Sequence, residues 1–202
     1  MKNIGFLLLA LFVAQAARAQ RDVEKRIADT RRELRAVGVD TSVCYYTYSY
    51  GVKKFVPGDT ACKARNIRYL FWTQGPQSLI QRFDECNRYP SERISTIFMN
   101  AVKAGIGRLP QEKILPAEYV YVKNGEKVKI GISETHNPQT VFEIYTGDTV
   151  IRKYIDWFDI GVVYVEGKYP NINYLNNLNT VQNNLKELAE AIVERKYGIQ
   201  PL

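Results

Sequence analysis

The chain has 202 residues, of which 46% are hydrophobic and 24% are charged, with 28 Lys and Arg residues against 21 Asp and Glu residues. This composition excludes disordered, collagen-like and low-complexity proteins. The length is sufficient for one domain with a well-buried apolar core.

Residues 1–19 have the pattern of a bacterial signal peptide. The basic residue Lys2 precedes an apolar run at 4–17, which ends in the small-residue motif Ala-Arg-Ala at 17–19. This run of about 14 residues is shorter than the roughly 20 that a helix needs to cross a bilayer. We therefore expect cleavage after Ala19, no remaining transmembrane anchor, and a periplasmic or secreted product. Cleavage removes two basic residues and no acidic one, which lowers the formal net charge from +7 to +5.

The mature chain, residues 20–202, is expected to form a single α+β domain. A loop at 107–116 has Pro near both ends and is the best place for a boundary between two halves. One continuous core is equally compatible with the pattern.

Three cysteines lie in the mature chain, and in an oxidising compartment two of them normally pair. A hairpin centred near Lys53 would place Cys44 opposite Cys62, so we favour this bridge, which would stabilise the fold by roughly 3 kcal/mol. A bridge between Cys62 and Cys86 is the alternative. The third cysteine is expected to be a small buried hydrophobe.

The first half of the mature chain contains both helix and strand patterns. Val23, Ile27 and Leu34 recur at helical spacing before the helix-stopping Gly38. Apolar residues also follow Pro76 at helical spacing, and proline favours the first turn of a helix. The expected elements are a helix at 21–37, strands at 43–50 and 64–72, a helix at 76–86 and a helix at 91–105.

The second half is richer in strands. Asn124-Gly125 is the strongest hairpin signal, because both residues tolerate the positive φ angles of a tight type I′ turn. The expected elements are hairpins at 119–133 and 140–156, a strand at 160–166 and a long helix at 173–197. Together the two halves predict an antiparallel sheet of about five or six strands with a C-terminal meander, helices packed on one face, and a long C-terminal helix.

Few residues of the sequence are suited to metal or cofactor chemistry. The single histidine, His136, excludes a zinc site with two histidine ligands from one chain. No Gly-rich phosphate loop occurs, so nucleotide chemistry has no support. We expect no metal and no cofactor.

A pair of carboxylates is the strongest catalytic candidate. Asp156 and Asp159 flank Trp157 and Phe158, where a sugar ring could stack. Two carboxylates are sufficient for glycoside hydrolysis. A secreted carboxylate-dependent hydrolase is therefore one alternative function.

Tyrosine is unusually frequent, with 14 residues in the chain. Tyrosine rings on a strand offer a rigid surface for a glycan or protein partner. The leading hypothesis is a non-catalytic binding protein of the bacterial envelope, whose recognition residues are Tyr45, Tyr48, Tyr50, Lys53 and Lys54. An oligomeric scaffold that associates through its first or last helix is a further alternative.

Basic and aromatic residues interleave at 63–72, a pattern that nucleic-acid-binding proteins use. An exported protein with a small positive charge has little opportunity to meet nucleic acid, so we do not expect it as a partner. A protein or a glycan of the cell envelope fits this chemistry better.

Overall fold

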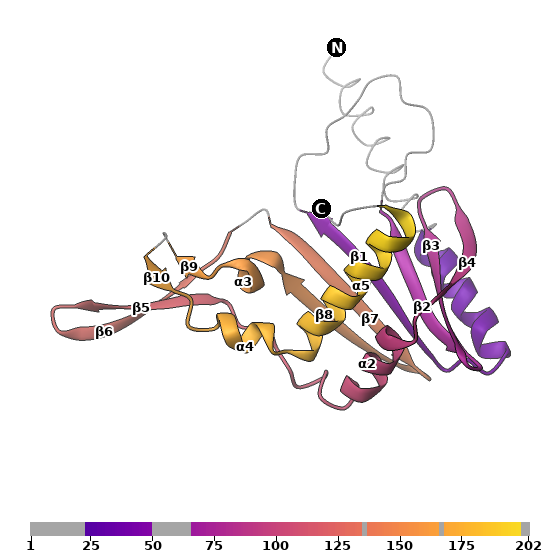
Figure 1. Cartoon of the computed structure of the whole chain (residues 1–202), viewed down its shortest axis with the longest axis horizontal. Helices are drawn as coiled ribbons and strands as arrows, with labels where there is room; N and C mark the ends of the chain where they lie inside the picture. The colour runs from indigo at the N-terminus through magenta and orange to yellow at the C-terminus, as the bar shows by residue number, and fades with distance from the viewer. Residues whose placement is uncertain (1–22, 50–65, 135–136, 166–167, 199–202) are drawn as a thin grey trace, which may run out of the picture.

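The computed structural model describes residues 23–49, 66–134, 137–165 and 168–198. Its largest element is a six-stranded antiparallel sheet in the order β4-β3-β2-β1-β7-β8. β1 pairs with β2 on one side and β7 on the other, so strands from both sides of the 107–116 loop form one sheet (Figure 1). The strands are β1 (Thr41–Ser49), β2 (Arg68–Gln74), β3 (Gln77–Phe83), β4 (Arg88–Ile94), β7 (Pro138–Thr146) and β8 (Thr149–Asp156).

Two helices, α2 (Ile97–Gly105) and α5 (Val181–Tyr197), cover one face of the sheet. The ring of Phe98 on α2 packs on that of Phe71 in β2, with 4.4 Å between the ring centroids. Leu185 on α5 is fully buried in the same cluster. This cluster is the larger of the two apolar cores.

The opposite face is covered by an N-terminal helix of residues 23–36. Successive side chains of a strand point to opposite faces, so β1 places Val43 and Tyr45 in the larger core and Cys44 in the second. The α+β class and the antiparallel sheet are confirmed. Helices were expected on one face, and the structure has them on both.

The segment expected to be a helix at 76–86 is instead β3. It pairs with β2 through a tight turn that contains Gly75, whose φ is 57°. Leu79 belongs to the second core and Ile80 to the first. Because both faces of the sheet are covered, the apolar residues of β3 do not alternate with polar ones, and their spacing imitates a helical stripe.

The C-terminal helical segment is divided in two. α4 (Tyr174–Leu178) is a single short turn, and α5 begins only after Thr180, whose hydroxyl accepts a hydrogen bond from the backbone N–H of Asn183 at 3.1 Å. This N-cap starts a new helix at Val181. The structure therefore has two helices, α4 and α5, where one continuous helix at 173–197 was expected, and the C-terminal helix α5 is shorter than predicted.

The expected elements at 91–105 and 160–166 also begin later than predicted. α2 starts at Ile97, because the preceding residues form β4. α3 (Trp157–Gly161) follows β8 directly, and the expected strand is reduced to the two-residue β9 (Tyr164–Val165), which pairs with β10 (Tyr169–Pro170). Asp156 caps α3 and so ends β8.

Both predicted hairpins are confirmed. β7 and β8 join at Gly147, and β5 (Ala117–Lys123) pairs with β6 (Glu126–Ile132) around Asn124 and Gly125, whose φ values are 53° and 83°. The β5–β6 hairpin projects away from the six-stranded sheet, with β9 and β10 beside its inner end (Figure 1). We call β5, β6, β9 and β10 the arm, and the six-stranded sheet with its helices the body.

Three buried asparagines, which we call the asparagine clasp, hold the root of the arm. Asn177 accepts a hydrogen bond from the backbone N–H of Leu115 and donates to the carbonyl oxygen of the same residue, at 2.9 and 2.7 Å. Asn173 donates to the carbonyl oxygen of Pro116 at 2.8 Å. Asn171 accepts from the N–H of Glu118 at 3.2 Å. All three side chains connect segments that are distant in the chain.

The predicted bridge between Cys44 and Cys62 is wrong in this structure, because Cys44 is a free, buried cysteine. Its strand neighbours are Leu70 and Glu143. Burial raises the pKa of the Cys44 thiol to about 12. Cys86 is disulfide-bonded, and Cys62 lies outside the described residues. The alternative pairing of Cys62 with Cys86 therefore stays a prediction.

Candidate binding site

The predicted recognition residues have different positions in the structure. Tyr45 is only 2% exposed, and its ring packs against Phe142 with 5.3 Å between centroids. Its assignment to a recognition surface is therefore wrong. Tyr48 is half-buried and donates a hydrogen bond to Gln139 at 2.7 Å. Tyr50, Lys53 and Lys54 lie outside the described residues.

Tyr48 lines a cavity of about 360 Å³ at the end of β1, which we call the tyrosine cavity. Residues of β1, β2, β8 and the N-terminal helix form its walls, and three tyrosine rings contribute to it. Its lining residues are Glu24, Tyr46, Thr47, Tyr48, Asn66, Ile67, Arg68 and Tyr154.

A second cavity, of about 190 Å³, lies between the N-terminal helix and the sheet, and we call it the arginine cavity. It shares Glu24 and Arg68 with the tyrosine cavity, so the two are neighbours on the same side of the sheet. Its lining residues are Glu24, Ile27, Ala28, Arg31, Arg68, Glu143, Tyr145 and Arg152.

Arg68 connects the two cavities. Its side chain is 9% exposed, and its guanidinium donates to Glu24 at 3.1 Å. The guanidinium carbon also lies 4.2 Å from the ring centroid of Tyr46. The antiparallel pairing of β1 with β2 brings these two side chains together, because Tyr45 and Tyr69, one position inward, are register partners. A nearly buried cation is thus held by one carboxylate and one aromatic face.

Glu143 and Arg152 form the far wall of the arginine cavity. They are register partners on β7 and β8, and their ion pair has an N–O distance of 3.2 Å. The hydroxyl of Tyr145 also donates to Glu143. Burial raises the pKa of Tyr145, and its hydrogen bond to the Glu143 carboxylate raises it further, so the phenol stays protonated.

Arg31 approaches the cavity from the N-terminal helix. Its guanidinium carbon lies 3.2 Å from the ring centroid of Tyr145. Burial lowers the pKa of Arg31, but the guanidinium remains charged at neutral pH. Its buried Nε has no hydrogen-bond partner within the described part of the chain. Leaving a buried donor unpaired costs about 1–3 kcal/mol, which a bound acceptor would offset.

Together the two cavities favour an anionic ligand with an apolar or ring-shaped body. The arginine cavity contains three guanidinium groups against two carboxylates. Arginine binds carboxylates in a bidentate manner, and such charged hydrogen bonds are stronger than neutral ones. Tyrosine rings provide flat faces for stacking and hydroxyls for hydrogen bonding.

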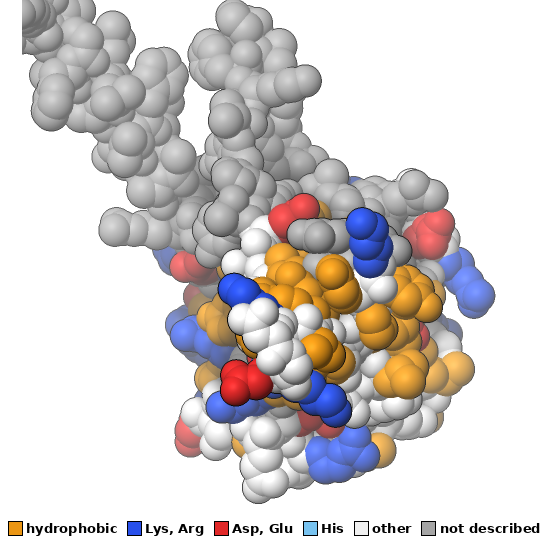
Figure 2. Space-filling model, turned by 90° about the vertical axis from the view of Figure 1, so that its left-hand side faces the viewer, with side chains coloured by type: hydrophobic (Ala, Val, Ile, Leu, Met, Phe, Trp, Pro, Cys, Tyr) orange, Lys and Arg blue, Asp and Glu red, His pale blue; other side chains and the backbone are white. Residues whose placement is uncertain are grey.

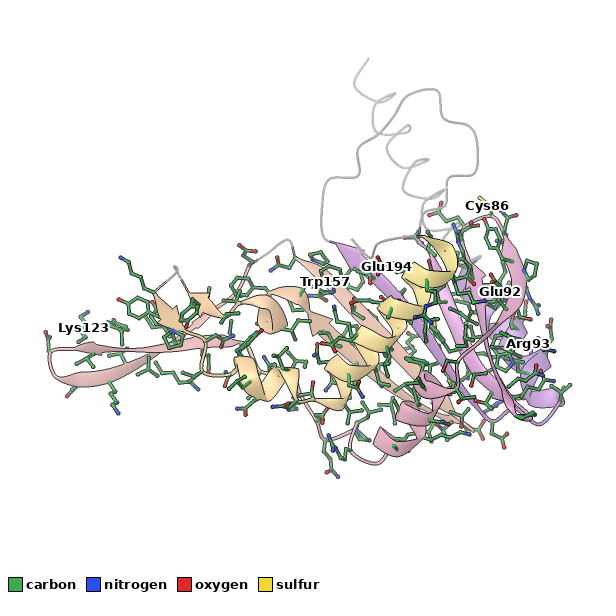
Figure 3. All side chains as sticks on the ribbon, in the orientation of Figure 1. Cys86, Glu92, Arg93, Lys123, Trp157 and Glu194 are labelled. Atoms are coloured by element: carbon green, nitrogen blue, oxygen red, sulfur yellow. The ribbon has the colours of Figure 1, made fainter. Side chains whose placement is uncertain are left out.

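The alternative catalytic pair is engaged in holding the backbone. Asp156 accepts a hydrogen bond from the N–H of Phe158, and Asp159 accepts one from the N–H of Ala117, both at 2.9 Å. Burial raises the pKa of Asp159. The Trp157 ring, labelled in Figure 3, lies 4.6 Å from the ammonium of Lys186. These groups therefore stabilise α3 and the root of the arm.

Two further features concern the part of the chain that the structure describes: clusters of metal-binding side chains and helices that could span a membrane. No group of three or more His, Cys, Asp and Glu side chains that could hold a metal ion occurs there. None of the helices described is long and apolar enough to cross a membrane. No protein-family model, curated protein or solved structure matches the chain.

The arginines of the site were missed by sequence reasoning, apart from the basic and aromatic pattern around Arg68. They come from separate elements: Arg31 from the N-terminal helix and Arg152 from β8. The one local signal was the alternation of Arg152 with Tyr154 along β8, which places both side chains on the same face.

Proposed function

We propose that the protein is an exported binding protein that recognises a carbohydrate chain carrying carboxylate groups. The observation that carries this proposal is the nearly buried guanidinium of Arg68, which lies between a tyrosine-lined and an arginine-lined cavity. The sugar rings would stack on Tyr48 and Tyr154. A carboxylate would bind at Arg31 and Arg152.

Two features support export. Residues 1–19 have the composition of a signal peptide, and Cys86 is disulfide-bonded, a state typical of oxidising compartments. Fractionation of the bacterial cell and mass spectrometry of the purified protein test this part. We expect the protein outside the cytoplasm with Gln20 as its first residue. A cytoplasmic protein that retains Met1 would contradict it.

Binding is tested by calorimetric titration of the mature protein with an oligogalacturonate and with a neutral oligosaccharide of the same length. We expect binding of the acidic chain only, weakened by added salt because charge attraction is screened. Arg152→Gln should lower the affinity about tenfold, the loss expected for one charged hydrogen bond. Arg32→Gln is the matched control, since its side chain is 80% exposed on the N-terminal helix.

Tyrosine stacking is tested separately with Tyr154→Ala. The side chain of Tyr154 is 55% exposed, so its removal should weaken binding while leaving the melting temperature nearly unchanged. Tyr164→Ala removes an equally exposed ring, 59%, from the arm and should bind normally. Equal affinity for neutral and acidic chains, or equal effects of the two tyrosine variants, would contradict the proposal.

A further inference from the structure

Exposed apolar side chains are concentrated on the arm and its base. Within the described residues, seven of the eleven exposed large hydrophobic residues lie there, although the body is far larger. Viewed from the tip of the arm, hydrophobic side chains lie beside basic ones (Figure 2). Such a concentration marks an interaction surface. The seven are Leu115, Val120, Val122, Val163, Tyr164, Ile172 and Leu175.

The hairpin of the arm has only two strands of seven residues each. A two-stranded hairpin is at best marginally stable in water without further strands or a packed face. On the β5 side, Tyr119 stacks on Tyr169 of β10 at 4.8 Å, and the N–H of Ile172 donates to the carbonyl of Glu118 at 2.9 Å. No strand lies on the outer side of β6 among the described residues. Its edge therefore offers unpaired backbone groups.

The two faces of β6 differ in character. Val128 and Ile130 are register partners of Tyr121 and Tyr119, and these half-buried side chains form one apolar face. On the other face, Lys127 lies opposite Val122, and Lys129 lies opposite Val120. Along β6, apolar and basic side chains thus alternate.

The charges of the arm favour a partner with acidic groups. Lys123, near the outer end of the hairpin in Figure 3, and Lys127 form no ion pair with the described residues. Lys129 pairs with Glu118, and Glu126 lies beside the turn. Edge lysines disfavour pairing with a second copy, because two such edges would bring like charges together.

We infer that the outer edge of β6 is a docking edge for an extended segment of another protein in which apolar and acidic residues alternate. The segment would add a third strand to the hairpin through backbone hydrogen bonds. Its apolar side chains would lie beside Val128 and Ile130, and its carboxylates beside Lys127 and Lys129. This inference is independent of the glycan site.

The test uses the mature protein and fluorescently labelled synthetic peptides of nine residues. One peptide alternates Val with Glu, a second alternates Val with Lys, and a third repeats the first with alternate backbone nitrogens methylated. We expect fluorescence anisotropy to detect binding of the first peptide only. Equal binding of the methylated peptide would overturn the inference, because added strands need backbone N–H donors.

Variants locate the binding edge. Lys127→Glu should weaken binding of the acidic peptide about tenfold or more, since it replaces attraction by repulsion. Arg93→Glu makes the same charge change on β4 of the body, at the position labelled in Figure 3, and should have no effect. Circular dichroism checks that both variants fold. Equal losses in the two variants, or a concentration-dependent dimer in light scattering that Lys127→Glu abolishes, would contradict the inference.

Arg152→Gln separates the two proposals. This variant is designed to impair glycan binding at the arginine cavity, and it should bind the acidic peptide normally. Loss of peptide binding in Arg152→Gln would show that the arm is not an independent site.

Discussion

The body buries its large apolar side chains, whereas the arm leaves several of its apolar side chains exposed to solvent. In the body, helices cover both faces of the sheet, so large side chains such as Phe71 and Phe142 have almost no exposed surface. In the arm, the two-stranded β5–β6 hairpin leaves Val122 66% exposed, and the root is held mainly by hydrogen bonds. This difference indicates that the body provides stability and that the arm presents surface.

The largest expected effect is in the body. Phe71→Ala should lower the free energy of unfolding by about 3–5 kcal/mol, because it empties a fully buried site against Phe98. Urea unfolding measures the loss. In the arm, Val122→Ala should change the stability by less than about 0.5 kcal/mol. Similar losses of unfolding free energy in both variants would show that the arm contributes as much to stability as the body does.

Substitutions at the root of the arm should give the next largest loss in the free energy of unfolding. Asn177→Ala removes hydrogen bonds to Leu115 and to the carbonyl oxygen of Asp159, and should cost about 2–3 kcal/mol. Hydrogen exchange should become faster in β5 and β6 more than in β1. Asn176→Ala is the matched control, because this neighbour is exposed. Uniform acceleration over the whole chain would show that the root and the body unfold together.

The contact between α2 and α5 gives a smaller effect. A Cβ at Gly105 would overlap Cγ1 of Val181. Gly105→Ala should therefore cost about 1–3 kcal/mol through overpacking. Adding Val181→Ala should restore part of the loss, which a double-mutant cycle in urea measures. Additive losses would show that the two side chains do not compete for space.

Asp159, at the root of the arm, should make the stability of the protein depend on pH. Burial and the nearby charge of Asp156 raise the pKa of Asp159 above its ordinary value of 3.8. The folded protein then binds this proton more tightly than the unfolded chain, so the contribution to stability is present at low pH and is lost as pH rises through the folded pKa. Asp159→Asn keeps an acceptor for Ala117 and lacks this titration.

Thermal melts of both proteins between about pH 3 and 7 measure this effect. The melting temperature of the wild-type protein should fall relative to that of Asp159→Asn as pH increases. A constant difference would contradict the raised pKa.

The smallest expected effect concerns the cysteines, and it is measured as the rate at which a thiol reagent labels them. Cys44 is buried and its pKa is raised to about 12, so a thiol reagent should label it only after denaturation. Peptide mapping without reduction should find Cys86 joined to Cys62. Rapid labelling of Cys44 in the native protein would show that the second core is open.

The sequence predicted those parts of the fold that local turns specify. Asn124-Gly125 identified the β5–β6 hairpin because its residues accept positive φ angles. β3 was missed because its burial on both faces removed the alternation that identifies a strand. The pairing of Cys44 was wrong because the register of β1 places Leu70 opposite it.

Less of the candidate site could be predicted. Tyr48 was identified on its strand, but Arg31 reaches the site only through the packing of the N-terminal helix on the sheet, and Arg152 only through the pairing of β8 with β7. The exposure of Tyr45 was predicted wrongly because alternation separates the two faces of β1 without telling which is covered more deeply. Sequence patterns describe single elements, and this site is made where five of them meet: the N-terminal helix, β1, β2, β7 and β8.

The asparagine clasp has a mechanical consequence. Apolar contacts are non-directional and tolerate small displacements of the groups that make them. The hydrogen bonds of Asn171, Asn173 and Asn177, in contrast, depend on both the donor–acceptor distance and the bond angle. Swinging the arm about its root would break several of these bonds at once. A force applied at the tip of the arm, near Lys123, would accordingly be transmitted through the root to the start of α5, because the arm moves as a rigid unit.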